Sequence, residues 1–159
     1  MSMLRWVWPV CLAIVGLFLL IGKGRWNVLD GVSLLMHEAG HLLFSFLGVF
    51  IQILGGTLLQ LVMPISFLIY FWRQRQVAGA QFGLFWLGQN LINVGVYVAD
   101  ARSQALPLIG DGLHDWAYLL GRMGLLQQDQ VIASMFYVLA VVAFGGMFLV
   151  PFWIGEEHG

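Results

Sequence analysis

The stretch "SLLMHEAGHLLFSFLG", residues 33–48, decides how this chain is interpreted. It places two histidines and a glutamate inside an otherwise apolar run. An ionisable side chain near the middle of a bilayer costs about 2.5–3.5 kcal/mol on insertion scales. Three such groups within one helical turn and a half require a compensating interaction, so the stretch predicts that they share a polar site.

The composition favours lipid as the solvent of most of the chain. Of its 159 residues, 60% are hydrophobic and only 9% are charged, whereas soluble domains carry about 25% charged residues. The mean hydropathy is +0.88. A net charge of −1 gives no electrostatic case for a nucleic-acid partner. We expect residues 1–159 to form one integral membrane domain that contacts lipid. The membrane we expect is the bacterial inner (cytoplasmic) membrane.

Five apolar runs are spaced along the chain, and each approaches the roughly 20 residues that one membrane crossing needs. We expect the glycines at 55–56 to separate the second run from the third, and Pro64 to kink the third. Residues 103–129 are more polar and predict an interfacial or re-entrant helical segment. The expected fold is an all-α transmembrane bundle of about five spans. The runs are 6–22, about 27–53, 57–72, 77–99 and 131–154.

The second run carries the chemistry. His37 and His41 are four residues apart, so on a helix they lie on one face. Two imidazoles there can bind one zinc ion and leave positions for a third ligand and a water molecule. Glu38 completes the H-E-x-x-H arrangement of zinc hydrolases. In that arrangement the zinc-bound water is the nucleophile and the carboxylate is the general base.

The rest of this helix agrees with a buried site. Either Asn27 or Asp30 is a suitable N-cap. At 100° per residue the polar side chains fall within an arc of about 140°, and the opposite face is apolar. A structural network of buried polar groups, or a haem or transport site, would use the same residues. The polar arc consists of Asp30, Ser33, His37, Glu38, His41 and Ser45.

At this point the chain resembles the site-2 protease family of intramembrane zinc metallopeptidases, as a minimal, single-module member. "HEAGH" at 37–41 stands within an apolar span, as the motif of that family does. The glycine pair at 55–56 and "LGQNLIN" at 87–93 are similar to the glycines and asparagine of its next core helices. "LPLIGDG" at 106–112 is similar to its later Leu-Asp-Gly element. The resemblance implies an aspartate as third zinc ligand and a transmembrane segment of another protein as substrate.

The fourth run has a polar stripe of its own, within an arc of about 80°. Such a stripe should pack against the zinc helix rather than lipid. Three different roles would account for the stripe. Its side chains could form hydrogen bonds between helices, support the zinc ligands, or bind the backbone of the substrate. Its last member, Asp100, is a candidate zinc ligand or the partner of Arg102 in a local ion pair. The stripe consists of Asn90, Asn93, Tyr97 and Asp100.

"GDGLHDW" at 110–116 offers three more donors: Asp111, His114 and Asp115. Asp111 suits a turn, and Asp115 suits the cap of the following helix. His114 has no comparable local role, and a third imidazole with a neighbouring carboxylate is a sound zinc site. We therefore expect His114 as the third ligand, with Asp115, Asp111 and Asp100 as the remaining candidates.

The leading function is an intramembrane zinc metallopeptidase that hydrolyses a peptide bond in or near a transmembrane segment, with Glu38 as general base. Its partner would be a membrane-spanning protein or peptide substrate. The alternative is a non-catalytic, pseudoprotease-like membrane protein that acts in assembly or interaction. A metal or proton transporter is a third and weaker option.

Overall fold

The computed structural model describes residues 4–23, 25–107 and 113–154, and within these ranges the chain forms helices and no strands. The described residues form five long α-helices, two shorter ones and two single turns of 3₁₀ helix. In chain order they are α1 (Leu4–Ile21), α2 (Val28–Leu43), η1 (Ser45–Leu47), α3 (Val49–Arg73), α4 (Val77–Ala99), α5 (Asp115–Met123), η2 (Leu126–Gln128), α6 (Asp129–Gly146) and α7 (Val150–Ile154).

Three helical segments are long and apolar enough to cross a membrane: α3, α4, and Leu126–Gly146, which joins η2 to α6. Five spans are therefore not confirmed. The apolar part of α1, Trp6–Ile21, is shorter than the other three. The helix α2 has 16 residues, about 24 Å at 1.5 Å per residue. The last apolar run does not form one helix, since α6 ends at Gly146 and α7 begins at Val150.

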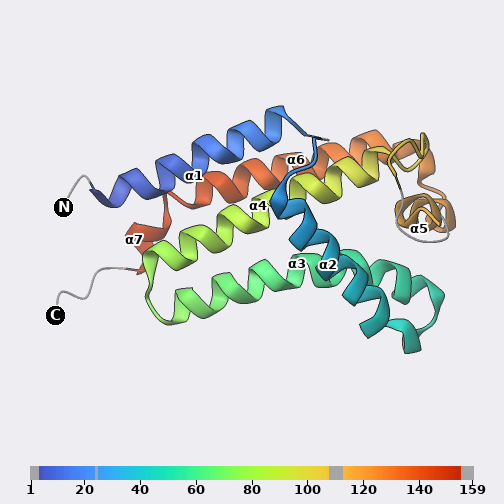
Figure 1. The fold of residues 1–159 in the computed structure, drawn as a ribbon, viewed down its shortest axis with the longest axis horizontal. Coiled ribbons are helices and arrows are strands. Elements are labelled where there is room, and N and C mark those ends of the chain that lie inside the picture. Colours follow the sequence, from blue (N-terminus) through green and yellow to red (C-terminus); the bar gives the residue numbers. More distant parts are fainter. Residues whose placement is uncertain (1–3, 24, 108–112, 155–159) are drawn as a thin grey trace.

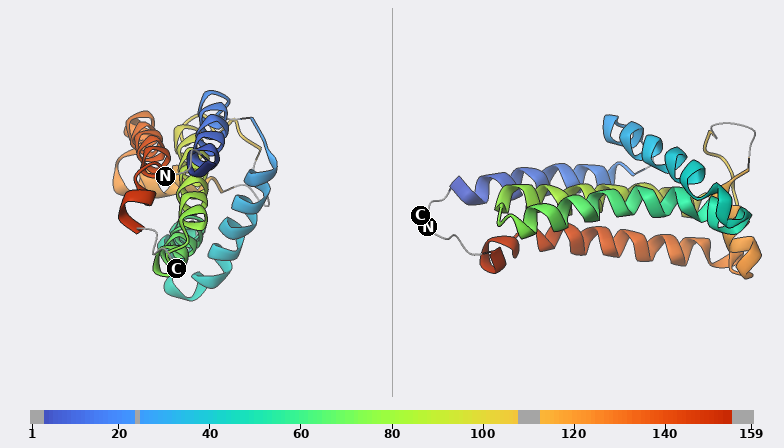
Figure 2. Two further views of the ribbon diagram at one scale, coloured as in Figure 1. Left: turned by 90° about the vertical axis from the view of Figure 1, so that its left-hand side faces the viewer. Right: turned by 90° about the horizontal axis from the view of Figure 1, so that it is seen from below.

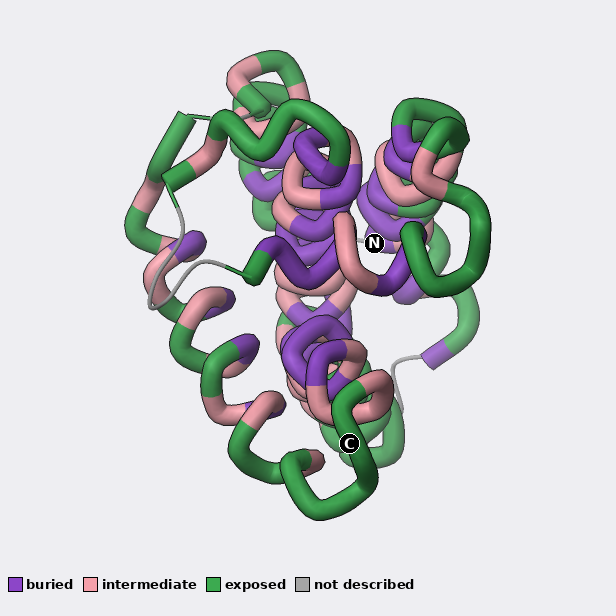
Figure 3. Tube along the Cα trace, turned by 90° about the vertical axis from the view of Figure 1, so that its right-hand side faces the viewer, coloured by how far each residue is buried: buried purple, intermediate pink, exposed green. Residues whose placement is uncertain are grey.

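The helix α4 is the centre of the bundle and packs against α6, α3 and α1. These four helices run along the long axis of the molecule, while α2 crosses them obliquely (Figures 1 and 2). Buried positions gather in the middle of the bundle and exposed ones on its periphery (Figure 3). One core cluster is built around Leu12, Phe85 and Phe144. A second cluster around Val98, Trp116 and Leu119 fixes α5 against α4.

The start of α2 is set by a capping box. The side-chain carbonyl of Asn27 accepts the backbone N–H of Leu29 at 2.9 Å, and Asp30 Oδ2 accepts the backbone N–H of Asn27 at 2.8 Å. Each bond satisfies a backbone N–H that the first turn of a helix leaves without a partner. Asn27 is therefore the N-cap, and Asp30 is held at the third helical position.

The two faces of α2 differ as the polar arc predicted. Asp30, Ser33 and His37 are buried against the bundle, whereas Leu35 and Leu42 are exposed. An apolar outer face of this kind suits contact with lipid rather than water. The inward face thus carries part of the predicted polar arc, whereas Glu38 is exposed and Ser45 is exposed in η1, beyond the end of α2.

The break between the second and third runs lies earlier than predicted. The chain turns at Gly48, whose φ of +87° favours glycine, and α3 then continues through Gly55 and Gly56 to Arg73. The glycine pair serves a different purpose. A Cβ on Gly40 of α2 would collide with the backbone carbonyl of Gly55, so these glycines allow α2 and α3 to cross with their backbones in contact.

Candidate metal centre

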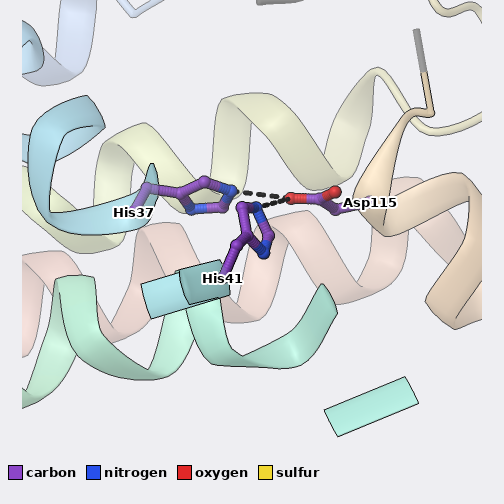
Figure 4. A group of neighbouring side chains, drawn as sticks. All are labelled: His37, His41 and Asp115. Carbon is purple, nitrogen blue, oxygen red and sulfur yellow. Dashed lines mark hydrogen bonds and ion pairs between the residues drawn. The ribbon is translucent and has the colours of Figure 1, made fainter. Parts of the chain in front are cut away.

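Three side chains from two distant parts of the chain converge at the inner face of α2 (Figure 4). The Nε2 atoms of His37 and His41 lie 2.6 Å and 3.1 Å from Asp115 Oδ2. One ligand atom from each residue lies within 4.8 Å of the other two. The imidazole rings stand at 88° to each other with their centroids 4.7 Å apart. Within the described ranges, this is the one group of three histidine, cysteine or acidic residues that could hold a metal ion.

The opposite nitrogen of each ring has a partner as well. His37 Nδ1 lies 3.2 Å from the side-chain oxygen of Gln60, and His41 Nδ1 lies 2.9 Å from the backbone oxygen of Gln52. Both partners come from α3 and are acceptors, so each Nδ1 carries a hydrogen. Each ring is thereby oriented with Nε2 toward Asp115, as histidines that bind metal are held by their other nitrogen.

Asp115 is the first residue of α5 and is only 7% exposed. Its backbone N–H donates to the Tyr97 hydroxyl at 3.3 Å, which ties the start of α5 to α4. Burial raises the pKa of its carboxyl, but hydrogen bonds from His37 and His41 outweigh burial, and the pKa lies below its ordinary value. The group is thus a buried carboxylate facing two imidazoles.

His114 does not join this cluster, so the preference for it over Asp115 as third ligand does not match the geometry. His114, rather than Asp115, caps α5: its Nδ1 accepts the backbone N–H of Ala117 at 3.3 Å. Its Nε2 lies 3.3 Å from Asp100 Oδ2. Because adjacent residues at a helix start point in different directions, only Asp115 can face α2 once His114 faces α4.

Asp100 is likewise committed elsewhere. Its Oδ1 accepts the hydroxyl of Ser103 at 2.6 Å and the backbone N–H of Ala105 at 2.9 Å, and its Oδ2 accepts the backbone N–H of Leu106 at 3.0 Å. Burial raises the pKa of its carboxyl, and these hydrogen bonds more than reverse that effect, so the pKa is lowered. Asp100 organises the loop after α4.

The ion pair expected between Asp100 and Arg102 is not formed. Arg102 instead holds Asp129 at the start of α6 with two contacts of 2.8 Å. Asp111, the remaining candidate ligand, lies outside the described residues.

The polar stripe of α4 divides into two parts. Asn93 and Tyr97 line the same cavity as the histidines, and Asn93 accepts a hydrogen bond from Gln60 at 2.9 Å. Asn90 faces along its own helix, where its side-chain N–H₂ donates to the backbone oxygen of Trp86 at 2.8 Å. Interhelical hydrogen bonding therefore accounts for Asn93, and Asn90 has no contact with the cluster.

A cavity of about 620 Å³ opens beside the cluster, between α1, α2, α4 and the residues Leu106, Pro107 and Leu113. The exposed carboxylate of Glu38 lines it together with His37, His41 and Asp115. Its other walls carry basic, aromatic and aliphatic side chains, among them Lys23, Arg25, Trp26, Leu34 and Pro107. The cavity brings Glu38 and the three converging side chains to one space that is large enough for a few residues of a peptide.

Gln60, which is 3% exposed and contacts His37 directly, was not among the residues that the sequence patterns indicated. A signal was present, because a glutamine in the apolar run 57–72 needs a hydrogen-bonding partner in lipid. Gln89, also buried, was missed in the same way; it contacts Ser33 and Asp30 of α2.

Comparisons of the chain with protein-family models, with curated proteins and with solved structures return no match.

Proposed function

We propose that the chain is a zinc-dependent intramembrane metallopeptidase, and the convergence of His37, His41 and Asp115 beside Glu38 carries this proposal. The donor set fits zinc: two imidazole nitrogens and one carboxylate oxygen are the ligands of a catalytic zinc site that keeps a position open. The fit extends to the rings themselves, since both Nδ1 atoms are engaged and both Nε2 atoms face inward. Zinc, when bound, supplies a Lewis acid that lowers the pKa of a coordinated water and polarises a carbonyl.

Glu38 is the residue to which we assign proton transfer. It follows His37 directly on α2, is exposed, and faces the cavity. In the hydrolysis of a peptide bond its carboxylate takes a proton from the attacking water and returns it to the nitrogen of the leaving amine. A general base of this kind contributes about 10²–10⁴-fold to the rate.

The surroundings of the site favour an apolar peptide as substrate. The bundle contains three helices that can span a membrane, and the cavity is lined in part by Trp26, Leu34 and Pro107. A membrane-embedded segment that is locally unwound would present its backbone to the site while its side chains contact these groups. Exclusion of water from most of the cavity by the bound substrate would strengthen each electrostatic interaction within the cavity.

Metal analysis of the purified protein tests the proposed site first. We expect one zinc ion per chain in the wild type and none in His37→Asn. The matched control is His114→Asn, because His114 is a buried histidine outside the cluster and asparagine is a good helix cap. This control should retain zinc.

Proteolysis tests the activity. The protein is reconstituted in vesicles with fluorescently labelled transmembrane peptides, and Glu38→Gln is compared with the wild type. We expect the variant to bind zinc and to cleave at least about 100-fold more slowly. Equal cleavage by the two proteins would exclude the peptidase. A wild type without zinc would favour the non-catalytic membrane role, in which the ion pairs of Asp115 only fasten α5 to α2.

A further inference from the structure

A continuous series of hydrogen-bonded side chains, buried except for the half-buried Asn93, leads from the start of α2 to His37. Asn93 of α4 donates its side-chain N–H₂ to Asp30 Oδ1 at 3.2 Å. Gln60 of α3 donates to Asn93 Oδ1 at 2.9 Å, and Gln60 Oε1 lies 3.2 Å from His37 Nδ1. Asp30 and His37 lie on the same helix, seven residues and about 10 Å apart. The hydrogen bonds connect these two residues through the side-chain amides of Gln60 on α3 and Asn93 on α4.

The direction of every hydrogen bond in this series is set at its Asp30 end. An ionised carboxylate only accepts hydrogen bonds. The Asp30 carboxylate accepts from Asn27, through a backbone N–H at 2.8 Å and a side-chain N–H₂ at 2.7 Å, and from Gln89 at 3.0 Å. Asn93 must therefore turn its N–H₂ toward Asp30 and its oxygen toward Gln60.

The orientation of the second amide, Gln60, follows from that of Asn93. Because Asn93 offers an oxygen, Gln60 must turn its N–H₂ toward Asn93, and its own oxygen then faces His37. An oxygen at that place requires the hydrogen of His37 to be on Nδ1. An amide side chain has one donor end and one acceptor end. The orientation of Asn93 therefore determines the orientation of Gln60, and the orientation of Gln60 determines which atom faces His37.

We infer that Asp30 is a remote positioning residue, which keeps a hydrogen on His37 Nδ1, so that Nε2, the nitrogen that lies 2.6 Å from Asp115 Oδ2, is the one that can exchange its hydrogen for a metal ion. The part of this inference that concerns zinc rests on the proposed function, whereas the place of the hydrogen does not. If Asp30 no longer fixed the direction, both amides would be able to turn over, and Gln60 would then donate to a bare Nδ1. Nδ1 would then carry no hydrogen, and the one hydrogen of the neutral ring would stay on Nε2 facing Asp115, where it competes with the metal.

The variant Asp30→Asn tests this, because it keeps the shape of the side chain and removes the fixed direction. The first readout is the ¹⁵N NMR signal of the His37 imidazole in the metal-free protein, assigned by its absence in His37→Asn. We expect Nδ1 to bear hydrogen in the wild type and to lose it in a substantial share of the Asp30→Asn molecules. The second readout is zinc affinity, which should fall about 10-fold, in the range that such supporting partners contribute.

Rescue separates positioning from a general structural effect. In the double variant Asp30→Asn/Gln60→Glu, the carboxylate at position 60 accepts from His37 Nδ1 whatever the direction at Asn93, so the hydrogen and the zinc affinity should both return. The matched control is Asp129→Asn, which removes another buried carboxylate, 1% exposed and held by Arg102, and should change neither readout. If Asp30→Asn does not fold, Asn93→Leu interrupts the series at its middle and should give the same two changes.

The outcomes are distinct. Wild-type NMR signal and zinc affinity in Asp30→Asn, or failure of the double variant to restore them, would overturn the inference. A wild type that binds no zinc but loses its Nδ1 hydrogen in Asp30→Asn would support the inference and contradict the proposed function.

Discussion

Gly56 gives the sharpest test of the site, because it forms the wall on which the two imidazoles lie. A Cβ added there would stand 2.7 Å from His37 Nε2 and 2.7 Å from His41 Cε1. Ordinary contact begins at 3.4 Å, so Gly56→Ala brings the methyl group about 0.7 Å too close to each ring. Zinc sites tolerate deviations of about 0.2 Å in their ligand distances. His37 cannot withdraw without loss of its hydrogen bond to Gln60.

We expect Gly56→Ala to lower zinc affinity about 100-fold, the upper end of the effect of misplaced supporting groups. The effect on folding should be smaller. Alanine improves helix propensity by about 1 kcal/mol, while overpacking costs about 1–3 kcal/mol, so the net loss of stability is at most about 2 kcal/mol. Isothermal titration with zinc gives the affinity, and thermal unfolding of the detergent-solubilised protein gives the stability.

Gly121→Ala is the matched control. Gly121 lies in α5, and an added Cβ would meet nothing within 4 Å. It should bind zinc as the wild type does and be slightly more stable, by up to about 1 kcal/mol. Wild-type zinc affinity in Gly56→Ala would refute the packing of His37 and His41 against Gly56 of α3, and with it the metal centre.

The remaining predictions concern the third ligand, metal linkage and pH. Asp115→Asn should lose zinc binding while His114→Asn retains it, as measured by metal content per chain; the reverse result would restore the three-histidine site. Zinc at about 100 times its dissociation constant should stabilise the folded protein by about 2.7 kcal/mol, seen as a rise in the thermal midpoint that a chelator reverses and that His37→Asn lacks. Asp100, whose pKa is lowered from 3.8, should stabilise the fold fully above that value and lose its contribution as the pH falls through the folded-state pKa. Asp100→Asn should therefore lower the thermal midpoint near neutral pH and differ less from the wild type at about pH 3, and a constant difference from about pH 5 to pH 3 would contradict this.

Local patterns were sufficient for the secondary structure of the site helix. The choice of Asn27 or Asp30 as cap, the inward polar face of most of α2 and the bounds of α4 all follow from neighbouring residues along one helix. The two histidines share a face because of the 3.6-residue period alone. For the same reason the sequence identified His37, Glu38 and His41 as a unit before any tertiary contact was known.

Neither the number of long apolar helices nor the third side chain of the cluster could be derived in this way. Apolar content does not give the length or the tilt of a helix, and α2 has only 16 residues and crosses the other helices obliquely (Figure 1). The break at Gly48 and the close contact at Gly55 both use glycine, and only the position of the neighbouring helix separates a turn from a crossing. The choice between His114 and Asp115 depended on which of two adjacent side chains faces α2.

The sequence by itself thus determined an amphipathic helix with two stacked imidazoles, a carboxylate beside them and an apolar chain around them. Only the tertiary structure decided that Asp115 meets those imidazoles, that Gln60 and Asn93 connect them to Asp30, and that Gly56 makes room for them. The physical reason is that helical periodicity is fixed by backbone geometry within a few residues, whereas contacts between helices depend on how their surfaces pack. Residues 37 and 115 are brought together by that packing of α2, α3, α4 and α5, and no local pattern contains it.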